Sequence, residues 1–571
     1  MSKSVLIIAP NSFAPIGVTG MEAPFQVATK TKHLASLSNL NRLFNYDMSG
    51  ATLDNGMKQL NPMAGYYLES FLRQHNYDAH ALFNWHKEDI EQALQIDPIA
   101  IAFSTTYVIS PEMLASCLAT LRETVHDIPI IVGGPYVWKQ TMAVNRYDAT
   151  TIERLKEFDA DVTADFLFSP NAQPVLRDAI YVANEFGEHT MLKVLQMIEQ
   201  GHTDINSLST INNLVLSLPN GSWHLTEWAQ EPVDVNKDYT RWDLVDSIPD
   251  MVPIRASIGC PYRCRFCDYI ELHPKVIMRS PQSLIEEIQL AKQRGRTIFN
   301  FIDDNIFLSK KRIGEITTMI REHEMGIYWG GFFRVDRVDE TNIENIYESG
   351  CRYGYCGIES ADVSMIKRIR KGCKPEELFR GINLCTQAGI HPMLTFIVGF
   401  PGETQQTLDV TTSFINRLEV NHRSYPSYHA YPLYVSPITS IDSLEYRQEY
   451  NLKGRYVSWS HDTMNYEEAV SKWAPYLFKQ INNVPYDYYG NDGGEWLGME
   501  KRNQAFRARN ALTKSFLNAE SDDQVQYSFS QLYQVLHKDD QATTVPSWHD
   551  YLADRKDQPG QKLVSLKPTA Q

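Results

Sequence analysis

Three cysteines with the spacing C-x-x-x-C-x-x-C constrain this chain more than any other feature. They are Cys260, Cys264 and Cys267, and they follow the apolar run 252–258. Three thiolates can hold three irons of a four-iron cluster and leave the fourth iron without a protein ligand, whereas a purely structural or electron-transfer cluster normally takes four cysteines. The motif therefore indicates an iron-sulfur site with one iron open to a further ligand.

Zinc, a disulfide and simple core packing are the competing interpretations of these cysteines. Structural zinc takes four ligands, usually as two C-x-x-C pairs, and neither a second pair nor a nearby H-x-x-x-H follows. A disulfide is disfavoured because no secretory signal precedes the apolar run 5–8 and only 8 of the 571 residues are cysteines. The other five cysteines match no strong metal template, and we expect them to be structural.

The chain after the motif alternates apolar strands with helices at the spacing of a parallel sheet or barrel. Ser280 and Pro281 predict the start of one helix, with Leu284, Ile288 and Ala291 on a single face. Polar residues gather just after the strands, which is the end of a parallel barrel where active sites form. The expected strands are 253–259, 297–302, 327–333, 353–358, 393–400 and 428–435.

The cysteine motif resembles the signature of the radical S-adenosylmethionine (SAM) superfamily, and Phe266 occupies the aromatic position that this family usually has before the last cysteine. The resemblance implies a 4Fe-4S cluster on the three cysteines and a partial (β/α)6 barrel. In that family the amino and carboxylate groups of SAM chelate the open iron. An electron from the cluster then cleaves SAM into methionine and a 5'-deoxyadenosyl radical.

The polar residues after the strands resemble the SAM-binding positions of the family. Carboxylates can accept hydrogen bonds from the SAM ammonium group, and Arg334, with Arg337 as the alternative, can pair with its carboxylate. A glycine turn lets backbone approach the adenine closely. Any one of these features alone is also typical of a strand-end turn or a helix cap. The predicted SAM contacts are Phe266, Asp303, Asp304, Arg334, Glu359, Ser360, Gly399, Pro401, Gly402 and Glu403.

Residues 1–205 have the pattern of a doubly wound α/β domain, in which ligands bind beyond the carboxyl ends of the strands. Strands are expected at 5–9, 99–103 and 128–132, and helices at 62–74 and 113–124. The unit resembles the Rossmann-type cobalamin-binding domain that precedes the barrel in class B radical SAM enzymes. The predicted cobalamin contacts are Ser104, Thr105, Thr106, Gly133, Gly134 and Pro135.

Two features depart from the cobalamin-binding pattern. No D-x-H-x-x-G segment is present, so the histidine that coordinates cobalt in some cobalamin proteins is missing, although many class B proteins lack it too. Residues 11–60 and 140–185 are also longer connections than a minimal domain needs. The alternative is a domain that kept the fold, lost the cofactor and only shapes the substrate cavity.

The expected organisation is a mixed α/β protein in four segments. A cobalamin-binding-like domain (1–205) is followed by a hairpin and linker (206–250), the barrel (251–435) and a mixed C-terminal domain with a polar tail (436–571). Aromatic residues of the last segment, including 486–489 and Trp496, suit a cavity for a small organic substrate, although such residues are more often core. His461 is the candidate catalytic residue there.

The overall charge limits the possible partners, and the class B resemblance predicts the activity. A net charge of -15 without a basic run argues against nucleic acid and anionic membranes as partners, and no apolar stretch has transmembrane length, so we expect a cytoplasmic protein. The resemblance implies a cobalamin-dependent methyltransferase that acts on an unactivated carbon or phosphorus of a small molecule or peptide, with a flavodoxin- or ferredoxin-type electron donor. The alternatives are a radical SAM enzyme without methyl transfer, which would catalyse rearrangement, elimination or transfer of another SAM fragment, and a non-catalytic sensor.

Overall fold

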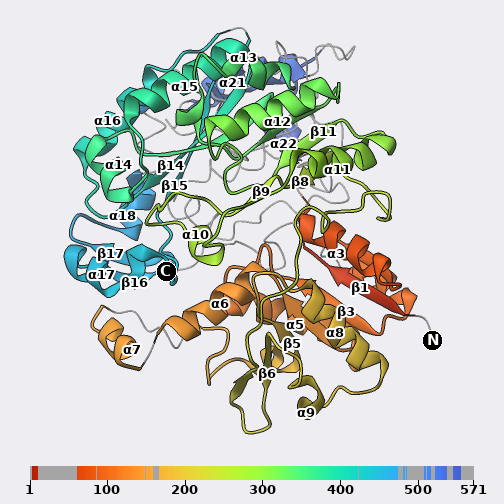
Figure 1. Ribbon diagram of the computed structural model, residues 1–571. Coiled ribbons are helices and arrows are strands. Elements are labelled where there is room, and N and C mark those ends of the chain that lie inside the picture. Colours follow the sequence, from red (N-terminus) through yellow and green to blue (C-terminus); the bar gives the residue numbers. More distant parts are fainter. Residues whose placement is uncertain are drawn as a thin grey trace.

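The computed structural model describes residues 3–10, 61–84, 87–147, 149–158, 166–421, 423–472, 521–536 and 544–553, with single positions between 480 and 515. An N-terminal α/β domain lies below a larger barrel-like body in Figure 1, and the short helix α10 (Tyr269–Leu272) lies between them. The predictions for residues 11–60, 486–489 and Trp496 lie outside the described residues.

The described part of the N-terminal domain is built on a seven-stranded sheet with the order β2-β1-β3-β4-β5-β6-β7. The first five strands are parallel, and the last two are antiparallel. The order 2-1-3-4-5 is that of a doubly wound fold with its switch point between β1 and β3. The strands are β1 (Ser4–Ile8), β2 (Asp78–Leu82), β3 (Ala100–Ser104), β4 (Ile130–Gly133), β5 (Ile180–Val182), β6 (Leu214–Ser217) and β7 (Trp223–Leu225).

Helices cover both faces of this sheet, and β1 is therefore buried on both sides. Val5 and Ile7 pack with α3 and α8, whereas Leu6 and Ile8 pack with α5 and α6. Strand β2 was not predicted, because the sequence Asp-Ala-His-Ala-Leu of this edge strand has too few apolar residues to mark it. The helices are α3 (Met63–Gln74), α4 (Lys87–Ala93), α5 (Pro111–Thr124), α6 (Pro135–Arg146), α7 (Ala149–Lys156), α8 (Glu188–Glu199) and α9 (Ile205–Leu208).

The second body is a partial parallel barrel, which confirms the expected fold class. Two three-stranded sheets, β12-β11-β8 and β13-β14-β15, are joined by bridges from Trp329 to Cys351 and from Phe332 to Tyr355. The six described parallel strands are β8 (Met251–Ile254), β11 (Ile298–Phe301), β12 (Tyr328–Gly331), β13 (Tyr353–Glu359), β14 (His391–Val398) and β15 (Ser427–Pro432). The helices around them are α11 (Pro281–Gln293), α12 (Lys310–Glu322), α13 (Ile343–Glu348), α14 (Val363–Ile369), α15 (Pro375–Ala388) and α16 (Gln405–Asn416).

The single strand predicted over residues 253–259 is wrong in one respect, because the structure divides it. Strand β8 ends at Ile254, and β9 (Ser257–Ile258) pairs antiparallel with β10 (Ile277–Met278) instead of continuing the barrel. The Asp303 carboxylate accepts hydrogen bonds from the Ala256 amide (2.9 Å) and the Ser257 hydroxyl (2.6 Å) at the break. These bonds replace sheet pairing and turn the chain toward the cysteine motif.

The described C-terminal residues add a small antiparallel sheet and several helices beside the barrel. The Asp442 carboxylate is fully buried and accepts hydrogen bonds from Arg447 (2.5 Å), Arg455 (2.8 and 2.7 Å) and the Tyr147 hydroxyl (2.5 Å). This cluster ties the N-terminal domain to the C-terminal segment. The elements are α17 (Leu444–Tyr450), β16 (Lys453–Arg455), β17 (Ser458–His461), β18 (Met464–Asn465), α18 (Tyr466–Ser471), α21 (Asp522–Leu536) and α22 (Trp548–Ala553).

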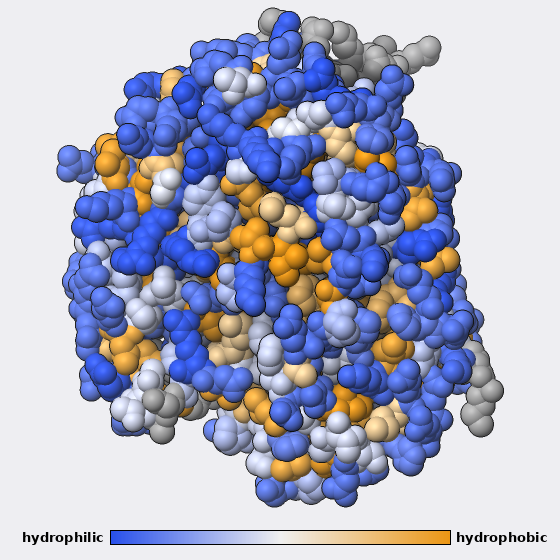
Figure 2. Space-filling model, viewed as in Figure 1, coloured by the Kyte–Doolittle hydropathy of each residue, from blue (hydrophilic) through white to orange (hydrophobic). Residues whose placement is uncertain are grey.

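The surface is mostly hydrophilic, with hydrophobic residues gathered near the middle of the face in Figure 2, where the barrel body meets the N-terminal domain. Among the described residues, no helix combines the length and the apolar character needed to cross a membrane.

Candidate functional site

The cysteine motif lies on a loop that leaves β9 at a glycine. Gly259 has a φ of +80°, and an added Cβ would lie 2.5 Å from the Lys275 carbonyl oxygen, so only glycine fits there. Its amide donates to the Asp304 carboxylate (2.9 Å), which holds the start of the loop. Cys264 is buried, and Cys260 and Cys267 are half-buried.

The three cysteine side chains form one electrostatic group. Burial raises the pKa of each thiol, and Cys264 contributes a further rise in the pKa of both Cys260 and Cys267. Lys371 and Arg334 act in the opposite direction on Cys264 and favour its thiolate. Among the described residues, no three His, Cys, Asp or Glu side chains converge on a single ion. A cluster does not require that convergence, because each thiolate binds a different iron.

Tyr262, inside the motif, is held by two arginines. The Arg334 guanidinium lies 3.7 Å from the centre of the Tyr262 ring, and Arg337 Nε donates to the Tyr262 hydroxyl (2.7 Å). Arg334 also donates to both carboxylate oxygens of Asp336 (3.0 and 3.1 Å) and to the Lys371 carbonyl (2.7 Å). These contacts brace the loop, and the predicted role of Arg334 at the SAM carboxylate stays a prediction.

A second buried ion pair stands beside the motif. Lys371 Nζ donates to Glu359 Oε1 at 2.8 Å, and both side chains are less than one-tenth exposed. Burial works to lower the pKa of Lys371, but Glu359 and Cys264 raise it, so the lysine is charged. Glu359 has a φ of +64° at a bulge in β13, a conformation that costs a non-glycine residue on the order of 1–3 kcal/mol. The neighbouring Ser360 hydroxyl lies 3.3 Å from that of Thr411.

The turn after β14 is fixed by Glu403 and His461. Glu403 accepts a hydrogen bond from the Gly399 amide (2.5 Å), and burial raises the pKa of its carboxyl to about 8. His461 Nε2 donates to the Gly399 carbonyl (2.9 Å), while Nδ1 accepts from the Thr463 amide (3.3 Å). Burial lowers the pKa of His461, which is therefore a neutral ring. This geometry suits a residue that positions the turn, and a catalytic role for His461 stays a prediction.

Gly402, Pro401 and Phe266 complete the predicted SAM contacts. Gly402 has a φ of +89°, and a Cβ there would lie 2.9 Å from the Arg368 guanidinium. Pro401 is buried in the same turn, and Phe266 packs half-buried against the main core. The structure thus brings the predicted SAM contacts to the carboxyl ends of the barrel strands, apart from Phe266, which lies on the cysteine loop after β9.

The predicted cobalamin residues lie at the carboxyl ends of β3 and β4, and β3 borders the switch point. The Thr105 hydroxyl donates to the Gly133 carbonyl (2.8 Å), and the Ser104 and Thr106 hydroxyls are 3.0 Å apart. Gly134 has a φ of +110°, and a Cβ there would lie 3.1 Å from the Thr105 amide nitrogen. The two strand ends can approach this closely only with glycine, and α6 begins at the next residue. Position and backbone geometry both fit a ligand site of this fold.

Helix α6 connects the two predicted cofactor sites. Lys139, one turn into the helix, pairs with Asp268 (2.8 Å), which directly follows Cys267. Asp268 also accepts a hydrogen bond from Ser436 (3.1 Å), and Trp138 Nε1 donates to the Leu272 carbonyl (3.3 Å). These contacts were not predictable from the sequence, because nothing in the local pattern of α6 marks its partner.

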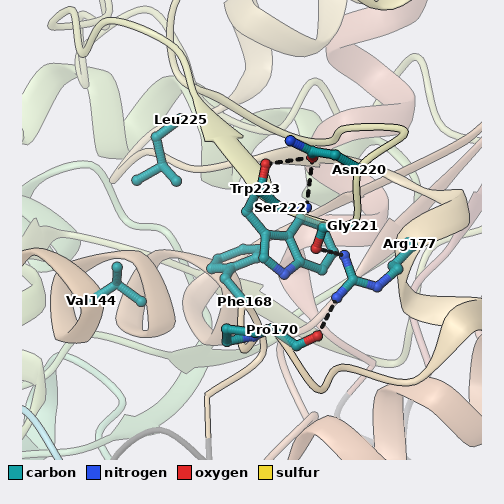
Figure 3. Close-up of a pocket in the computed structure, with 9 residues that line it drawn as sticks. All are labelled: Val144, Phe168, Pro170, Arg177, Asn220, Gly221, Ser222, Trp223 and Leu225. Carbon is teal, nitrogen blue, oxygen red and sulfur yellow. Dashed lines mark hydrogen bonds between the residues drawn. The ribbon is translucent and has the colours of Figure 1, made fainter.

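A hollow of about 700 Å³ lies elsewhere, at the antiparallel edge of the N-terminal sheet (Figure 3). Arg177 points along it and donates to the carbonyls of Gly221 (2.6 Å) and Pro170 (2.7 Å). None of the residues predicted for SAM or cobalamin lines this hollow, so it is separate from the site described above.

Comparison with known proteins finds a family domain over the cysteine motif and most of the barrel. Residues 254–415 match the family model of the radical SAM superfamily. The chain therefore contains a radical SAM domain, and such a domain implies a 4Fe-4S cluster and SAM.

Two curated relatives are similar to part of the chain. An uncharacterized methyltransferase of Pyrococcus horikoshii is 30% identical over 189 residues, which are 33% of this chain and 41% of the relative. The anaerobic magnesium-protoporphyrin IX monomethyl ester cyclase of Rubrivivax gelatinosus is 24% identical over 258 residues, which are 43% of this chain and 46% of the relative. The chain thus spans less than half the length of these relatives.

Solved structures of the radical SAM methyltransferase TsrM from Kitasatospora setae share the fold. The one with tryptophan substrate and a SAM analogue is 15% identical with a TM-score of 0.56, over 89% of this chain and 99% of that chain. The one with cobalamin and a [4Fe-4S] cluster is 15% identical with a TM-score of 0.50, over 79% of this chain and 78% of that chain. The likeness therefore extends beyond the radical SAM domain to most of the chain.

Proposed function

We propose that this protein is a radical SAM enzyme that uses cobalamin to methylate an unactivated carbon or phosphorus of a small molecule or peptide. The observation that carries the proposal is the placement of the three-cysteine motif beside a switch-point domain, with α6 joining the two. The names of the methyltransferase relative and of TsrM support methyl transfer. The TsrM structure that holds cobalamin supports the cofactor.

In this proposal the two cofactors supply one-electron cleavage of SAM and a methyl carrier when they are bound. Cys260, Cys264 and Cys267 would hold the cluster, while the two arginines on Tyr262 keep the loop in place. The turn that Glu403 fixes would face the adenine, and the strand-end polar groups would orient the rest of SAM. Rigid positioning matters because a primary carbon radical reacts with almost any C–H bond nearby.

Radical chemistry without methyl transfer is the second candidate, favoured by the cyclase name of one relative. A third candidate, a cobalamin or SAM sensor, would need no reducible cluster. For the enzyme we propose a flavodoxin- or ferredoxin-type electron donor and a reducing cytoplasmic setting, because the cluster must accept an electron before SAM is cleaved. The net charge of -15 supports a partner other than nucleic acid.

The test begins with protein purified anaerobically, reconstituted with iron and sulfide, incubated with cobalamin and desalted. We expect about four irons and about one cobalt per chain, with release of 5'-deoxyadenosine from SAM under reducing conditions. A full cluster without cobalt would refute the methyltransferase proposal and leave the radical SAM activity.

Two cysteine variants sharpen the test. Cys267→Ala should abolish SAM cleavage and retain cobalamin binding. Cys373→Ala is the matched control, because this half-buried cysteine lies outside the motif and should keep both iron content and cleavage. Unchanged SAM cleavage in Cys267→Ala would contradict the assignment of the motif.

A further inference from the structure

The residue that directly follows Cys267 is held by a lysine of the other domain. Asp268 Oδ2 accepts hydrogen bonds from Lys139 Nζ at 2.8 Å and from the Ser436 hydroxyl at 3.1 Å. The Lys139 and Asp268 side chains are only 16% and 21% exposed, so salt and water screen the pair in part. Within the described chain neither side chain has a second ion-pair partner. Each is therefore the counterion of the other.

Both ends of this ion pair are anchored to ordered backbone. Helix α6, which carries Lys139, begins at Pro135, and the neighbouring Trp138 donates its Nε1 hydrogen to the Leu272 carbonyl at 3.3 Å. The Leu272 amide in turn donates to the Asp268 carbonyl at 2.9 Å, because Asp268 lies at the start of α10. Helix α6 thus contacts α10 at two points, where the two domains meet (Figure 1). These contacts hold the Lys139 ammonium beside the cysteine loop.

The charge of Asp268 acts on the position of the predicted cluster. Burial raises the pKa of both Cys267 and Tyr269, and the Asp268 carboxylate raises each of them further. A charge that disfavours the Cys267 thiolate also disfavours an added electron on the cluster that this thiolate binds, because both changes add negative charge at the same place. The Lys139 ammonium has the opposite sign and offsets this effect of Asp268.

The origin of Lys139 separates it from the other cations that act on the motif. Arg334 and Lys371 favour the Cys264 thiolate, and both belong to the barrel that carries the motif. Lys139 belongs to the N-terminal domain, one turn into the helix that starts at the predicted cobalamin site. Net charge around the sulfur ligands is one of the properties that set the reduction potential of an iron-sulfur cluster.

We propose that Lys139 is a positioning residue through which the N-terminal domain sets the reduction potential of the cluster in the barrel. Lys139 acts through Asp268, whose charge it neutralises beside Cys267. The neutralised pair makes it easier for the cluster to accept the single electron that the electron donor supplies and that SAM cleavage consumes. The inference rests on the cluster that the radical SAM domain implies and requires neither cobalamin nor a particular substrate.

The test is a redox titration of the reconstituted full-length protein with dithionite at pH 8, followed by electron paramagnetic resonance. Lys139→Met leaves the Asp268 carboxylate unpaired and should lower the midpoint potential, whereas Asp268→Asn leaves the Lys139 ammonium unpaired and should raise it. At the wild-type midpoint, the ratio of reduced to oxidised cluster should fall about 5-fold in the first variant and rise about 5-fold in the second. The double variant has lost both charges and should stay within about 2-fold of the wild type.

Opposite shifts distinguish an electrostatic role from a structural one, because both single variants break the same contact. Shifts in the same direction, or unchanged potentials in both variants, would overturn the inference. Lys139→Gln replaces Lys139→Met if iron counts show that the methionine variant loses the cluster, and the same lowering is expected. Lys156→Met, at an exposed lysine on α7, is the control and should keep the wild-type potential.

Cobalt is counted on the same samples, which separates this inference from the proposed function. A protein that binds cobalt and a full cluster but whose potential ignores both substitutions refutes only the inference. Opposite shifts in a protein that binds no cobalt refute only the proposed methyltransferase.

Discussion

The buried Glu403 carboxyl should make the stability of the protein fall as pH rises. Its pKa is raised by burial from 4.5 to about 8. Between these two values the folded state holds a proton on Glu403 that the unfolded state has released. The free energy of unfolding therefore falls with increasing pH, by about 1.4 kcal/mol per pH unit for one proton. From pH 6 to pH 8 the expected loss from this group is about 2.5 kcal/mol.

The substitution Glu403→Gln isolates this effect. Glutamine keeps the size of the side chain and an oxygen that can accept the Gly399 amide hydrogen bond, but it cannot ionise. We expect the thermal unfolding midpoint of the variant to change less between pH 6 and pH 8 than that of the wild type, with the variant the more stable protein at pH 8. The assay is thermal unfolding followed by circular dichroism across this range.

Glu445→Gln provides the matched control, because Glu445 is exposed near the start of α17 and its substitution should leave the wild-type pH profile unchanged. Parallel profiles for the wild type and Glu403→Gln would refute the reasoning. That result would mean that Glu403 is ionised in the folded protein at pH 6, with a cation or water compensating its charge.

Three further predictions concern the positions of the two cofactor sites. Arg334→Lys keeps the charge but loses the planar stack on Tyr262 inside the cysteine motif, which is worth about 1–2 kcal/mol. The loosened motif should hold the cluster less well, so the iron retained after desalting should drop well below that of the exposed control Arg321→Lys. Gly134→Ala should destabilise the protein more than Gly221→Ala, because both have positive φ but a Cβ meets Thr105 only at Gly134; equal shifts in unfolding midpoint would contradict this. Lys139→Met removes a mostly buried ion pair and should cost about 1–3 kcal/mol in unfolding free energy, against little change for the exposed control Lys156→Met.

Much of the fold followed from local patterns in the sequence. Apolar runs at βα spacing predicted the barrel strands, and the helix that begins at Pro281 has the expected cap, with the Ser280 hydroxyl accepting from the Ser283 amide (3.2 Å). The hairpin expected within residues 206–250 is present as β6 and β7, with Asn220 and Gly221 between the two strands, and it extends the N-terminal sheet. Edge strand β2 escaped prediction because its partner β1, not its own sequence, makes it a strand.

The candidate site was predictable only as a set of residues near strand ends. The motif at Cys260 marked the cluster position because ligand spacing is a local property of the chain. The sequence did not reveal that Asp303 would be enclosed by backbone and hydroxyl donors, or that both ring nitrogens of His461 would be occupied by the turn it supports. Those roles depend on which other groups reach the same point, and this information is spread over distant segments.

The sequence by itself determined most of the elements, the cysteine motif and most strand-end positions, because each depends on residues within a few places of one another. The tertiary structure alone decided the long-range pairs: Lys139 with Asp268, 129 residues apart, and Arg337 with Tyr262, 75 residues apart. Closing the sheet into a partial barrel brings such groups together, and a one-dimensional pattern contains no signal for that closure.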